Sequence, residues 1–378
     1  MNILFTGGRA PATLDLVRAF QRAGHTVFMA ESLRGHLSQP SNAIHANFLV
    51  PPPRQEKDAF LFALKKIVKE NQIDLLIPTC EEVFYTAMAH DELPVFTEPI
   101  KKLNQFHNKW NFVINSVDGN LYVPETMLVR SQNDLLHAFA QWRELVLKPV
   151  YSRFASRTLI LPPLKKALST LTFETKEMWI AQEYKEGQVF CTYSVCHQGH
   201  ITAHTTYPSK FTAGQGATIA FEHVEHPAIF EWVRTFVKRY QLTGQVAFDF
   251  IQTADGQIFA LECNPRATSG VHLLASHPRF AEAFLNPDMD CITPIENGYY
   301  MLSAAMILYA LPASLIHGRF GEWFKTFFTS DDVILNFKDP LPFLLQLRSL
   351  LATRTIASRQ KISLLEASTF DIEWNGEG

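Results

Sequence analysis

The stretch GQVAFDFIQTADGQIFALECNPR, residues 244–266, predicts two β-strands joined by a tight turn. Asp255-Gly256 lies between two runs with strand-like patterns, and this dipeptide is typical of a two-residue type I′ turn. Such a turn fixes the cross-strand register and places Asp249 directly opposite Glu262. Because side chains alternate along a strand, Asn264 shares the face of Glu262. The hairpin therefore gathers two acids and an amide on one face of a sheet.

Directly opposed carboxylates in a sheet repel each other unless something compensates. A hard divalent cation is a natural compensation, because Mg²⁺ takes oxygen ligands from one or two carboxylates and completes its octahedron with phosphate oxygens and water. Two alternatives stay open: one acid is protonated, or both are solvated at a sheet edge. Arg266 adds a cation able to bind phosphate or an oxyanion in a bidentate manner. Phe248 and Phe250 alternate with the acid between them and are expected on the opposite, buried face.

The 378 residues carry 34 Lys and Arg against 37 Asp and Glu, a formal charge of −3. Hydrophobic residues make up 47%, and at about 150 residues per domain the length predicts two or three packed domains. This charge balance gives no drive towards nucleic acid or an anionic membrane, so neither is an expected partner. The five cysteines are odd in number and scattered, and the N-terminus lacks a signal-peptide pattern. We therefore interpret the protein as cytoplasmic, with reduced thiols.

The first 100 residues alternate strand and helix patterns. Strands are expected at 2–6, 26–30 and 73–78, and helices at 12–23 and 60–70. This order predicts a parallel sheet with helices on its faces, which binds ligands at the carboxyl ends of its strands.

Gly7-Gly8 follows the first expected strand but lacks the G-x-G-x-x-G spacing of a dinucleotide site, so a simple tight turn is favoured. From residue 123 the pattern changes to short β segments, at 145–150, 158–161, 179–184 and 190–197. After the decisive hairpin comes a largely helical, aromatic-rich tail. Within it, residues 299–316 carry no charge, but Pro312 interrupts them and no basic flank marks a membrane orientation. We expect a buried core helix or a subunit contact there, which leaves a homo-oligomer open.

The hairpin resembles the large-fragment signature of the ATP-grasp superfamily, an Asp on one strand and Glu-x-Asn on the next. Asp249 and Glu262-Cys263-Asn264 match it, and the following Pro265-Arg266 is similar to the Asn-Pro-Arg run of the carbamoyl-phosphate synthetase large chain. The resemblance implies that Asp249, Glu262 and Asn264 bind Mg²⁺, with Mn²⁺ as a substitute, and that Arg266 is catalytic.

Other positions fit the same resemblance, which implies ATP as the cofactor. Lys148 in LVLKPV resembles the strand lysine that reaches ATP phosphates, and Lys109 in HNKWNF the earlier lysine of the nucleotide-binding unit. WIAQEYKEGQ resembles the adenine hinge, which implies backbone bonds to the base from Glu183 and Tyr184. Gln188 falls where the family often has a ribose-binding acid.

Lys210 in YPSKFTAGQGA falls in what would be a catalytic lid loop over the phosphates. One departure from the family stands at residues 151–157, which lack the glycine-rich phosphate loop that often follows the strand lysine. Arg153 or Arg157 would replace the backbone donors with charge, or packing would close the loop; both interpretations stay open.

The resemblance covers residues 1 to about 280 and implies a Rossmann-like domain preceding the ATP-grasp fold at 1–105, its small subdomain at 106–190 and its large subdomain at 191–285. The remaining residues, 286–378, match no part of the family and are expected to form a mainly helical extension. The overall class expected is α/β, or α+β for the whole chain. In the first domain, Glu81 and Glu82 follow a predicted strand, where ligands bind. Either acid could bind the ammonium of an amino-acid substrate, or both could simply favour a helix start.

The resemblance implies an ATP- and Mg²⁺-dependent ligase that joins a small-molecule carboxylate to an amine through an acyl phosphate. Two alternatives remain at this stage. A small-molecule kinase would use the same ATP site and stop at phosphoryl transfer. A non-catalytic nucleotide-binding protein is suggested by the missing glycine loop and the long unassigned tail.

Overall fold

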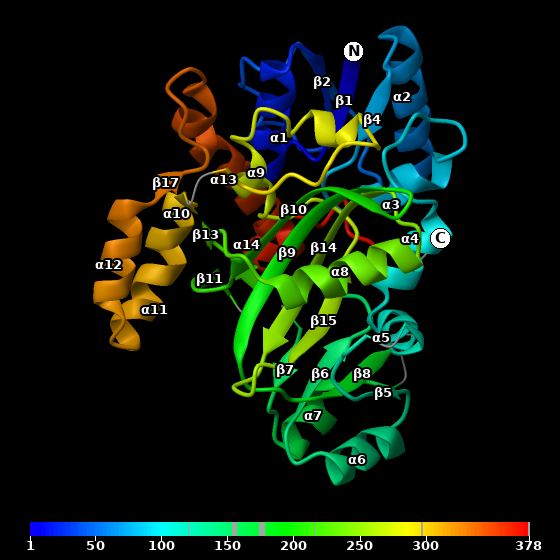
Figure 1. The fold of residues 1–378 in the computed structure, drawn as a ribbon, viewed down its shortest axis with the longest axis vertical. Coiled ribbons are helices and arrows are strands. Elements are labelled where there is room, and N and C mark those ends of the chain that lie inside the picture. The colour runs from blue at the N-terminus through cyan, green and yellow to red at the C-terminus, as the bar shows by residue number, and fades with distance from the viewer. Residues whose placement is uncertain (120, 153–156, 174–177, 215, 296–297, 377–378) are drawn as a thin grey trace.

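The computed structural model describes residues 1–119, 121–152, 157–173, 178–214, 216–295 and 298–376. Figure 1 shows a parallel sheet at the top, a long antiparallel sheet in the middle and a small antiparallel sheet at the bottom. Helices α11 and α12 lie along the left side. The expected class, α/β with a parallel sheet in its N-terminal part, is confirmed.

The N-terminal part forms a parallel sheet in the order β3-β2-β1-β4. Its elements are β1 (Asn2–Thr6), α1 (Pro11–Arg22), β2 (Thr26–Glu31), β3 (Ala46–Leu49), α2 (Lys57–Glu70), β4 (Leu75–Ile77), α3 (Val83–Thr86), η1 (Ala87–Ala89) and α4 (Ile100–His107). Ile3 and Phe5 pack in one core with α1, whereas Leu4 packs with α2 on the other face. Apolar residues thus cover both faces of β1, as a parallel sheet between helices requires. The sequence pattern missed β3, because four residues are too short for a clear alternation.

The middle part is an antiparallel sheet in the order β10-β9-β14-β15. Its elements are α5 (Lys109–Asp118), β9 (Gln188–His197), β10 (His200–Pro208), α8 (Pro227–Arg239), β14 (Gly244–Gln252) and β15 (Ile258–Asn264). Helix α8 covers one face, where the ring of Trp232 lies 5.2 Å from that of Phe248 and 5.1 Å from that of Phe250. The two phenylalanines are therefore buried on one face, as the hairpin pattern predicted.

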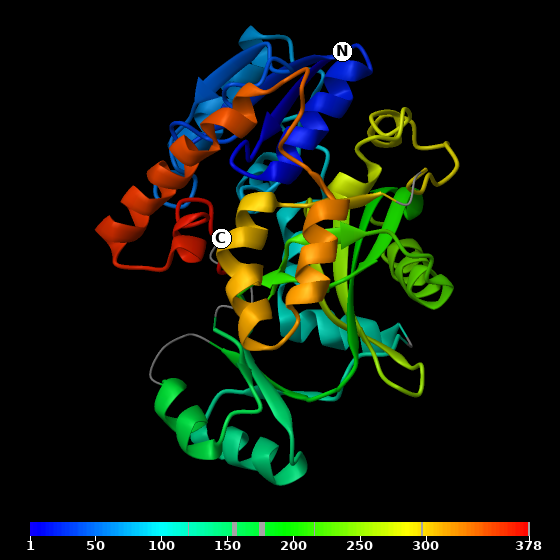
Figure 2. The ribbon, with the colours of Figure 1, turned by 90° about the vertical axis from the view of Figure 1, so that its left-hand side faces the viewer.

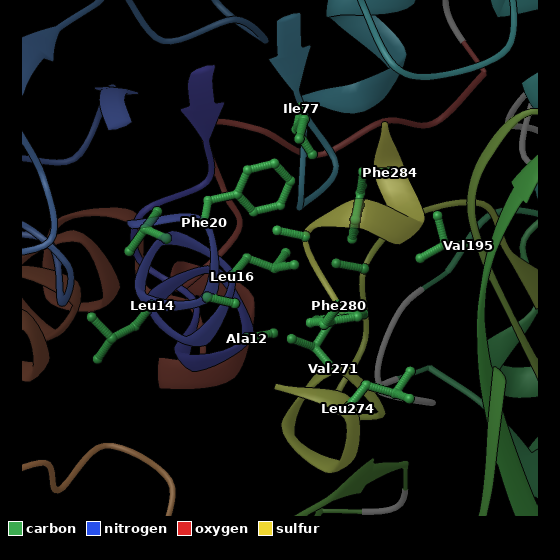
Figure 3. Packing of buried hydrophobic residues seen from close by; sticks show 14 of the residues in the cluster. Ala12, Leu14, Leu16, Phe20, Ile77, Val195, Val271, Leu274, Phe280 and Phe284 are labelled. Carbon is green, nitrogen blue, oxygen red and sulfur yellow. The ribbon is translucent and has the colours of Figure 1, made fainter. Parts of the chain in front are cut away.

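The other face of this sheet packs against the N-terminal part. Figure 3 shows Leu16 and Phe20 of α1 pointing toward Phe280 and Phe284, with Val195 of β9 beyond them. The rings of Phe20 and Phe284 are 5.4 Å apart. The short elements here are α9 (Val271–Leu274) and η2 (Glu282–Phe284). One continuous core thus fixes the parallel sheet against the large antiparallel sheet.

The small sheet has the order β5-β8-β6-β7 and is antiparallel. Its elements are β5 (Thr126–Val129), α6 (Gln132–Gln141), β6 (Leu145–Pro149), β7 (Leu159–Ile160), α7 (Leu164–Thr170) and β8 (Trp179–Glu183). It has its own core, in which Leu145 and Leu147 of β6 pack with Leu135 of α6. Alternation along β6 leaves Lys148 on the face opposite this core.

The rest of the chain is mainly helical. Its elements are β11 (Thr212–Ala213), β12 (Ala217–Thr218), β13 (Ala220–Glu222), β16 (Tyr299–Met301), α10 (Ser303–Ala305), η3 (Met306–Ala310), α11 (Leu311–Ile316), α12 (Phe320–Thr329), β17 (Asp331–Asp332), α13 (Leu341–Gln360) and α14 (Leu364–Ala367). The expected buried helix at 299–316 is wrong for one face, because Leu308, Leu315 and Ile316 are exposed. Among the described residues, no helix is both long and apolar enough to cross a membrane.

Residues 368–376, which we call the C-terminal strap, cross the carboxyl ends of β1 and β2. The guanidinium of Arg9, just after β1, pairs with Glu31 at the end of β2 and with Asp371 of the strap. A cavity of about 10 Å³ remains between the strap and the sheet, lined by Glu31, Glu82 and Ile372 among others. That space accommodates about one water molecule. The sheet edge where a ligand was expected is therefore largely filled by the chain itself.

Trp374 anchors the strap. Its side chain is 1% exposed, its ring lies 5.7 Å from that of Phe84 and 5.2 Å from that of Tyr85, and its Nε1 donates to Asn104 Oδ1 at 2.7 Å. A tryptophan with a satisfied N–H in a packed core contributes strongly to stability.

Trp374→Ala is expected to lower the free energy of unfolding by about 3–5 kcal/mol, because it removes a buried aromatic ring and leaves a cavity. Urea denaturation followed by circular dichroism measures this loss. Phe62→Ala is the matched control, because Phe62 is 72% exposed and its loss should change stability by less than about 0.5 kcal/mol. Equal effects of the two substitutions would show that the strap is not part of the core.

Candidate functional site

The two acids of the hairpin lie directly opposite each other. Strands β14 and β15 pair Asp249 with Glu262 and Ala247 with Asn264. The side chains of these four residues share the sheet face opposite that of Phe248, which packs under α8. The predicted juxtaposition of the carboxylates is therefore present.

The turn that produces this register differs from the predicted one. Thr253 donates its N–H to Gln257 O, and Gly256 donates its N–H to Thr253 O with a φ of +84°. This is a three-residue turn, in which glycine takes the left-handed position. A β-bulge between Asp249 and the next residue then places Leu261 as an extra residue on β15. The bulge offsets the longer turn, so the two acids still face each other.

The electrostatics of the pair are asymmetric. Burial and the negative charge of Glu262 raise the pKa of Asp249. Burial alone would raise the pKa of Glu262 as well, but the ammonium groups of Lys109 and Lys148 outweigh it and lower that pKa. The pair thus favours a state in which Glu262 is ionised and Asp249 retains a proton.

Lys109 reaches the pair from the first turn of α5. Asn108 caps this helix by accepting the N–H of Asn111 at 2.9 Å, which fixes Lys109 as its first residue. The Lys109 side chain is buried, and its Nζ lies 3.2 Å from Glu262 Oε2 and donates to Ser152 O at 3.1 Å. An ammonium group thus lies against the carboxylate where a metal cation was predicted.

Lys148 reaches the same place from β6. Its Nζ donates to Gln182 Oε1 on β8 at 2.9 Å. Burial lowers the pKa of Lys148 to about 8, although the charge of Glu262 opposes this shift. A buried ammonium with a lowered pKa lacks a full complement of negative charge, which is the condition that a phosphate group would satisfy.

Arg266 connects the hairpin to the N-terminal sheet. Its Nη2 donates to Asn264 Oδ1 at 3.3 Å, and Asn264 Nδ2 donates to Glu262 Oε1 at 3.4 Å. Its Nε lies 3.5 Å from Glu81 Oε1, and His107 Nε2 lies 4.0 Å from Glu81 Oε2. The structure therefore brings Glu81 together with the predicted catalytic arginine.

Glu82 has a different environment. Its Oε1 accepts the hydroxyl of Thr6 at 2.7 Å and the N–H groups of Thr79 and Cys80 at 3.1 and 3.0 Å. Burial raises the pKa of Glu82. These bonds close the loop between β4 and α3, so the structure distinguishes a site-facing Glu81 from a loop-closing Glu82.

The predicted hinge residues lie at the end of β8. Glu183 donates its N–H to Glu125 O at 2.8 Å, and Tyr184 donates its N–H to Glu144 O at 3.1 Å. Both donors are thus already used within the sheet. A backbone N–H for an adenine base would have to come from a residue after Tyr184.

Gln188 begins β9, and the register places its side chain away from the acids. Cys191 pairs with Asp249, whereas Gln188 and Phe190 alternate onto the face that packs under α8. Gln188 is exposed at this strand end. The contact with a ribose that was predicted for it therefore finds no support in the register.

Lys210 lies on the loop between β10 and β11, and its side chain pairs with an acid other than Asp249 and Glu262. Its side chain is about half exposed, and its Nζ pairs with Glu222 Oε2 on β13 at 2.5 Å. Strands β11 and β12 form a small hairpin next to it. A role over the phosphates would require this exposed ion pair to open.

The glycine-poor loop at 151–157 is described only at its ends. The predicted alternative at Arg153 lies outside the described residues. Arg157 places its guanidinium 5.5 Å from the ring centroid of Trp179. Lys109 N donates to Val150 O at 3.1 Å, so the start of this loop is tied to the start of α5.

Sequence reasoning missed two residues of the site, Gln182 and His107. Gln182 is a buried polar residue within an apolar strand, and it orients Lys148. His107 is buried at the end of α4, two residues before Lys109. Each is a polar side chain in an otherwise apolar run of sequence. This pattern is visible in the sequence, but without the fold it does not distinguish a site residue from any other buried polar residue.

The donor set fits a magnesium ion better than a transition metal. Within the part of the chain that the structure describes, no group of three or more His, Cys, Asp or Glu side chains lies close enough to bind a metal. Asp249, Glu262 and Asn264 offer oxygen ligands on one face, and the two carboxylates repel each other when both are ionised. Mg²⁺ takes one or two carboxylates and relies on phosphate and water for the rest.

Comparison with known proteins finds similarity in three-dimensional structure and not in sequence. No protein-family model matches the sequence. A comparison with curated proteins finds no match either.

Several solved structures match most of the chain in fold. An N5-carboxyaminoimidazole synthetase from Staphylococcus aureus complexed with ADP has a TM-score of 0.65 at 13% identity, covering 84% of this chain and 86% of that chain. A biotin carboxylase from Campylobacter jejuni has a TM-score of 0.60 at 14% identity, covering 79% and 74%. An L-amino acid ligase from Bacillus licheniformis has a TM-score of 0.57 at 15% identity, covering 74% and 68%. The chain therefore has the ATP-grasp fold that the sequence signature implied.

Asp249→Asn is expected to stabilise the protein increasingly as the pH rises. The raised native-state pKa of Asp249 means that its contribution to stability is present below the ordinary pKa near 4 and is lost at higher pH. Urea unfolding without divalent cations, from about pH 4 to about pH 8, measures the difference between variant and wild type.

Asp255→Asn is the matched control with the opposite sign. The Thr253 hydroxyl lowers the pKa of Asp255, so the wild-type residue stabilises the turn above its ordinary pKa and the variant should not gain stability. Parallel pH curves for wild type and Asp249→Asn would refute the proposed repulsion.

Proposed function

We propose that this chain is an ATP- and Mg²⁺-dependent ligase that joins a carboxylate to an amine through an acyl phosphate. The observation that carries the proposal is the convergence of Lys109, Lys148, Asp249 and Glu262 from α5, β6, β14 and β15. The ATP-grasp fold supports it, because similar solved structures include a synthetase complexed with ADP and a carboxylase domain complexed with MgADP.

The nucleotide would lie between the small sheet and the large sheet. Lys109 and Lys148 would bind its phosphates, and Lys210 would join them when its lid segment closes. Asp249, Glu262 and Asn264 would hold Mg²⁺, with Mn²⁺ as a substitute. When bound, the divalent cation would neutralise phosphate charge and orient the phosphate oxygens.

The reaction would begin with attack of a carboxylate oxygen on the γ-phosphorus, forming an acyl phosphate and releasing ADP. An amine would then add to the acyl carbon, and phosphate would leave with the bonding electron pair while the nitrogen loses a proton. Arg266 would bind the acyl phosphate or the oxyanion, where a fixed cation lowers the energy of developing negative charge. A closed lid would exclude water, because acyl phosphates hydrolyse.

Glu81 is the residue that we assign to the substrate end. Its carboxylate is 2% exposed and lies against Arg266 and His107, so it connects the N-terminal part to the site. A substrate ammonium would pair with this acid, which supports an amino acid or small amino compound as one partner. We do not assign Glu82 to the substrate, because its carboxylate accepts hydrogen bonds that close its own loop.

Glu262→Gln is expected to reduce turnover by at least about 100-fold while the protein stays folded, because it removes a charge proposed to act on metal and lysine together. The measurement is ADP release across a Mg²⁺ titration, with circular dichroism for folding. Glu231→Gln, on the exposed face of α8, is the control and should retain wild-type turnover. Wild-type turnover of Glu262→Gln at limiting Mg²⁺ would refute the metal assignment.

The reaction type is tested by Mg²⁺-dependent ADP release across a matrix of amino acids and small carboxylates, each with and without a second amine. We expect ADP release that needs both partners, with a product lighter than their sum by one water in mass spectrometry. ADP release with one partner that keeps the phosphate would instead identify a kinase. ATP binding without ADP release under any combination would favour a non-catalytic nucleotide-binding protein, the reading suggested by the glycine-poor loop.

A further inference from the structure

Helix α12 carries five aromatic side chains on one broad face, and Glu322, Lys325 and Thr329 lie on the other. Trp323 and Phe327 point inward and pack in a core with Met306 and Ala310 of the preceding helical segment. Phe320, Phe324 and Phe328 recur at every fourth residue on the outer part of the same apolar face and are exposed. An apolar stripe on a helix normally packs against another element. The outer part of this stripe lacks a cover among the described elements.

The neighbouring helical segments also expose apolar side chains. Leu308, Leu315 and Ile316 of η3 and α11 are exposed, and the six side chains are 44–79% exposed. Figures 1 and 2 show α11 and α12 side by side as a pair that projects from the body of the molecule. We call the outer surface made by these six side chains the hairpin face.

The area of the hairpin face is that of an interface. An aromatic side chain carries roughly 150–250 Å², so three half-exposed phenylalanines present on the order of 300 Å². With a comparable area from the three aliphatic residues, the face reaches on the order of 600 Å². A stable protein interface buries about 800 Å² per partner, and a lone apolar patch of this size marks an interaction site.

The charge of the segment that forms α11 and α12 indicates the kind of partner. Residues 303–329 contain Arg319, Lys325 and Glu322 as their charged side chains, and Arg319 is paired with Glu322 at 2.9 Å. A nearly neutral face lacks the basic cluster that directs binding to anionic lipid. Helix α13 is different, because its three arginines and absence of acids would repel a second α13.

We propose that the hairpin face binds the same face of a second copy of this chain, forming a two-fold dimer in which four helices pack together. A two-fold interface uses one patch twice, so it must be self-complementary in shape and charge. A neutral pair of helices meets the charge condition. The row of phenylalanines at every fourth residue is a ridge of the type that packs into the grooves of another helix.

The inner side of the same hairpin supports the segment that carries Lys210. Phe211, Ala213 and Ile219 pack in one core with Trp323 and Met306. Arg319 Nη2 donates to Lys210 O at 3.5 Å, and its guanidinium lies 5.4 Å from the ring centroid of Phe211. Covering the outer face would therefore stabilise the base on which β11 and β12 rest. The effect on β11 and β12 rests on the proposed function, because it concerns the lid segment of the ligase. The proposed dimer does not depend on that function.

The test is the molar mass of the full chain by size-exclusion chromatography with light scattering. We expect wild type at twice the chain mass of 43.0 kDa at micromolar concentration. Phe324→Asp and, on the other helix, Ile316→Asp should each weaken the dimer at least tenfold. Phe62→Asp on α2 is the matched control, an exposed phenylalanine elsewhere, and should leave the mass unchanged. Thermal unfolding confirms that each variant is folded, and two variants on different helices keep the test valid if one misfolds.

Three results would overturn the proposal. One is a monomeric wild type at about 100 µM, and another is a dimer that neither hairpin variant weakens. The third is a monomer that cosediments with phosphatidylglycerol vesicles and loses this binding in Phe324→Asp, which would assign the face to a lipid surface. None of these measurements needs nucleotide, so their failure is separate from failure of the ligase reaction.

Hydrogen exchange tests the connection to the lid. In folded, monomeric Phe324→Asp we expect the amides of β11 and β12 to exchange at least several-fold faster than in the wild-type dimer. Unchanged exchange in these strands would overturn the connection between the hairpin face and the lid.

Discussion

The repulsion between Asp249 and Glu262 is the constraint around which the rest of the site is arranged. The hairpin places two acids face to face, and a buried pair of this kind destabilises a fold unless positive charge offsets it. The offset comes from distant segments, with Lys109 at the start of α5 and Lys148 on β6. Three parts of the chain must therefore meet at one point. An arrangement that costs stability locally and is repaired from a distance is typical of a functional site.

The C-terminal strap changes what the N-terminal sheet can do. Parallel sheets offer ligands the carboxyl ends of their strands, but here Arg9, Asp371 and Trp374 fasten the strap across that edge. With about 10 Å³ left, a substrate does not fit under the strap. The loop after β4 still projects Glu81 to Arg266. The N-terminal part thus contacts Arg266 through the loop after β4, while its sheet edge is closed by packing.

The sequence predicted the parallel sheet and the carboxylate pair because both rest on local patterns. The carboxylate pair was predicted correctly from a turn that was predicted wrongly. The structure has a three-residue turn and a bulge at Leu261, which together give the same register as the predicted two-residue turn. The predicted ribose contact of Gln188 gains no support from the register, because one position along a strand reverses the face. Glu81 and Glu82 are equivalent in sequence, and their bonds alone separate them. Trp374 meets Phe84 across most of the chain, and no local pattern encodes such a contact.

The charges that meet in the described site nearly cancel. With Asp249 protonated, Lys109, Lys148 and Arg266 face the carboxylates of Glu81 and Glu262, so a nucleotide with about four negative charges would enter a site with little net attraction for it. Additional positive charge has to arrive with or after the nucleotide. A divalent cation held by Asp249 and Glu262 would supply part of it and offset their repulsion. Lys210 supplies more if it leaves Glu222, and an exposed ion pair of that kind costs only about 0–1 kcal/mol to open. The balance of charge thus explains why the proposed reaction would need the metal and Lys210 together.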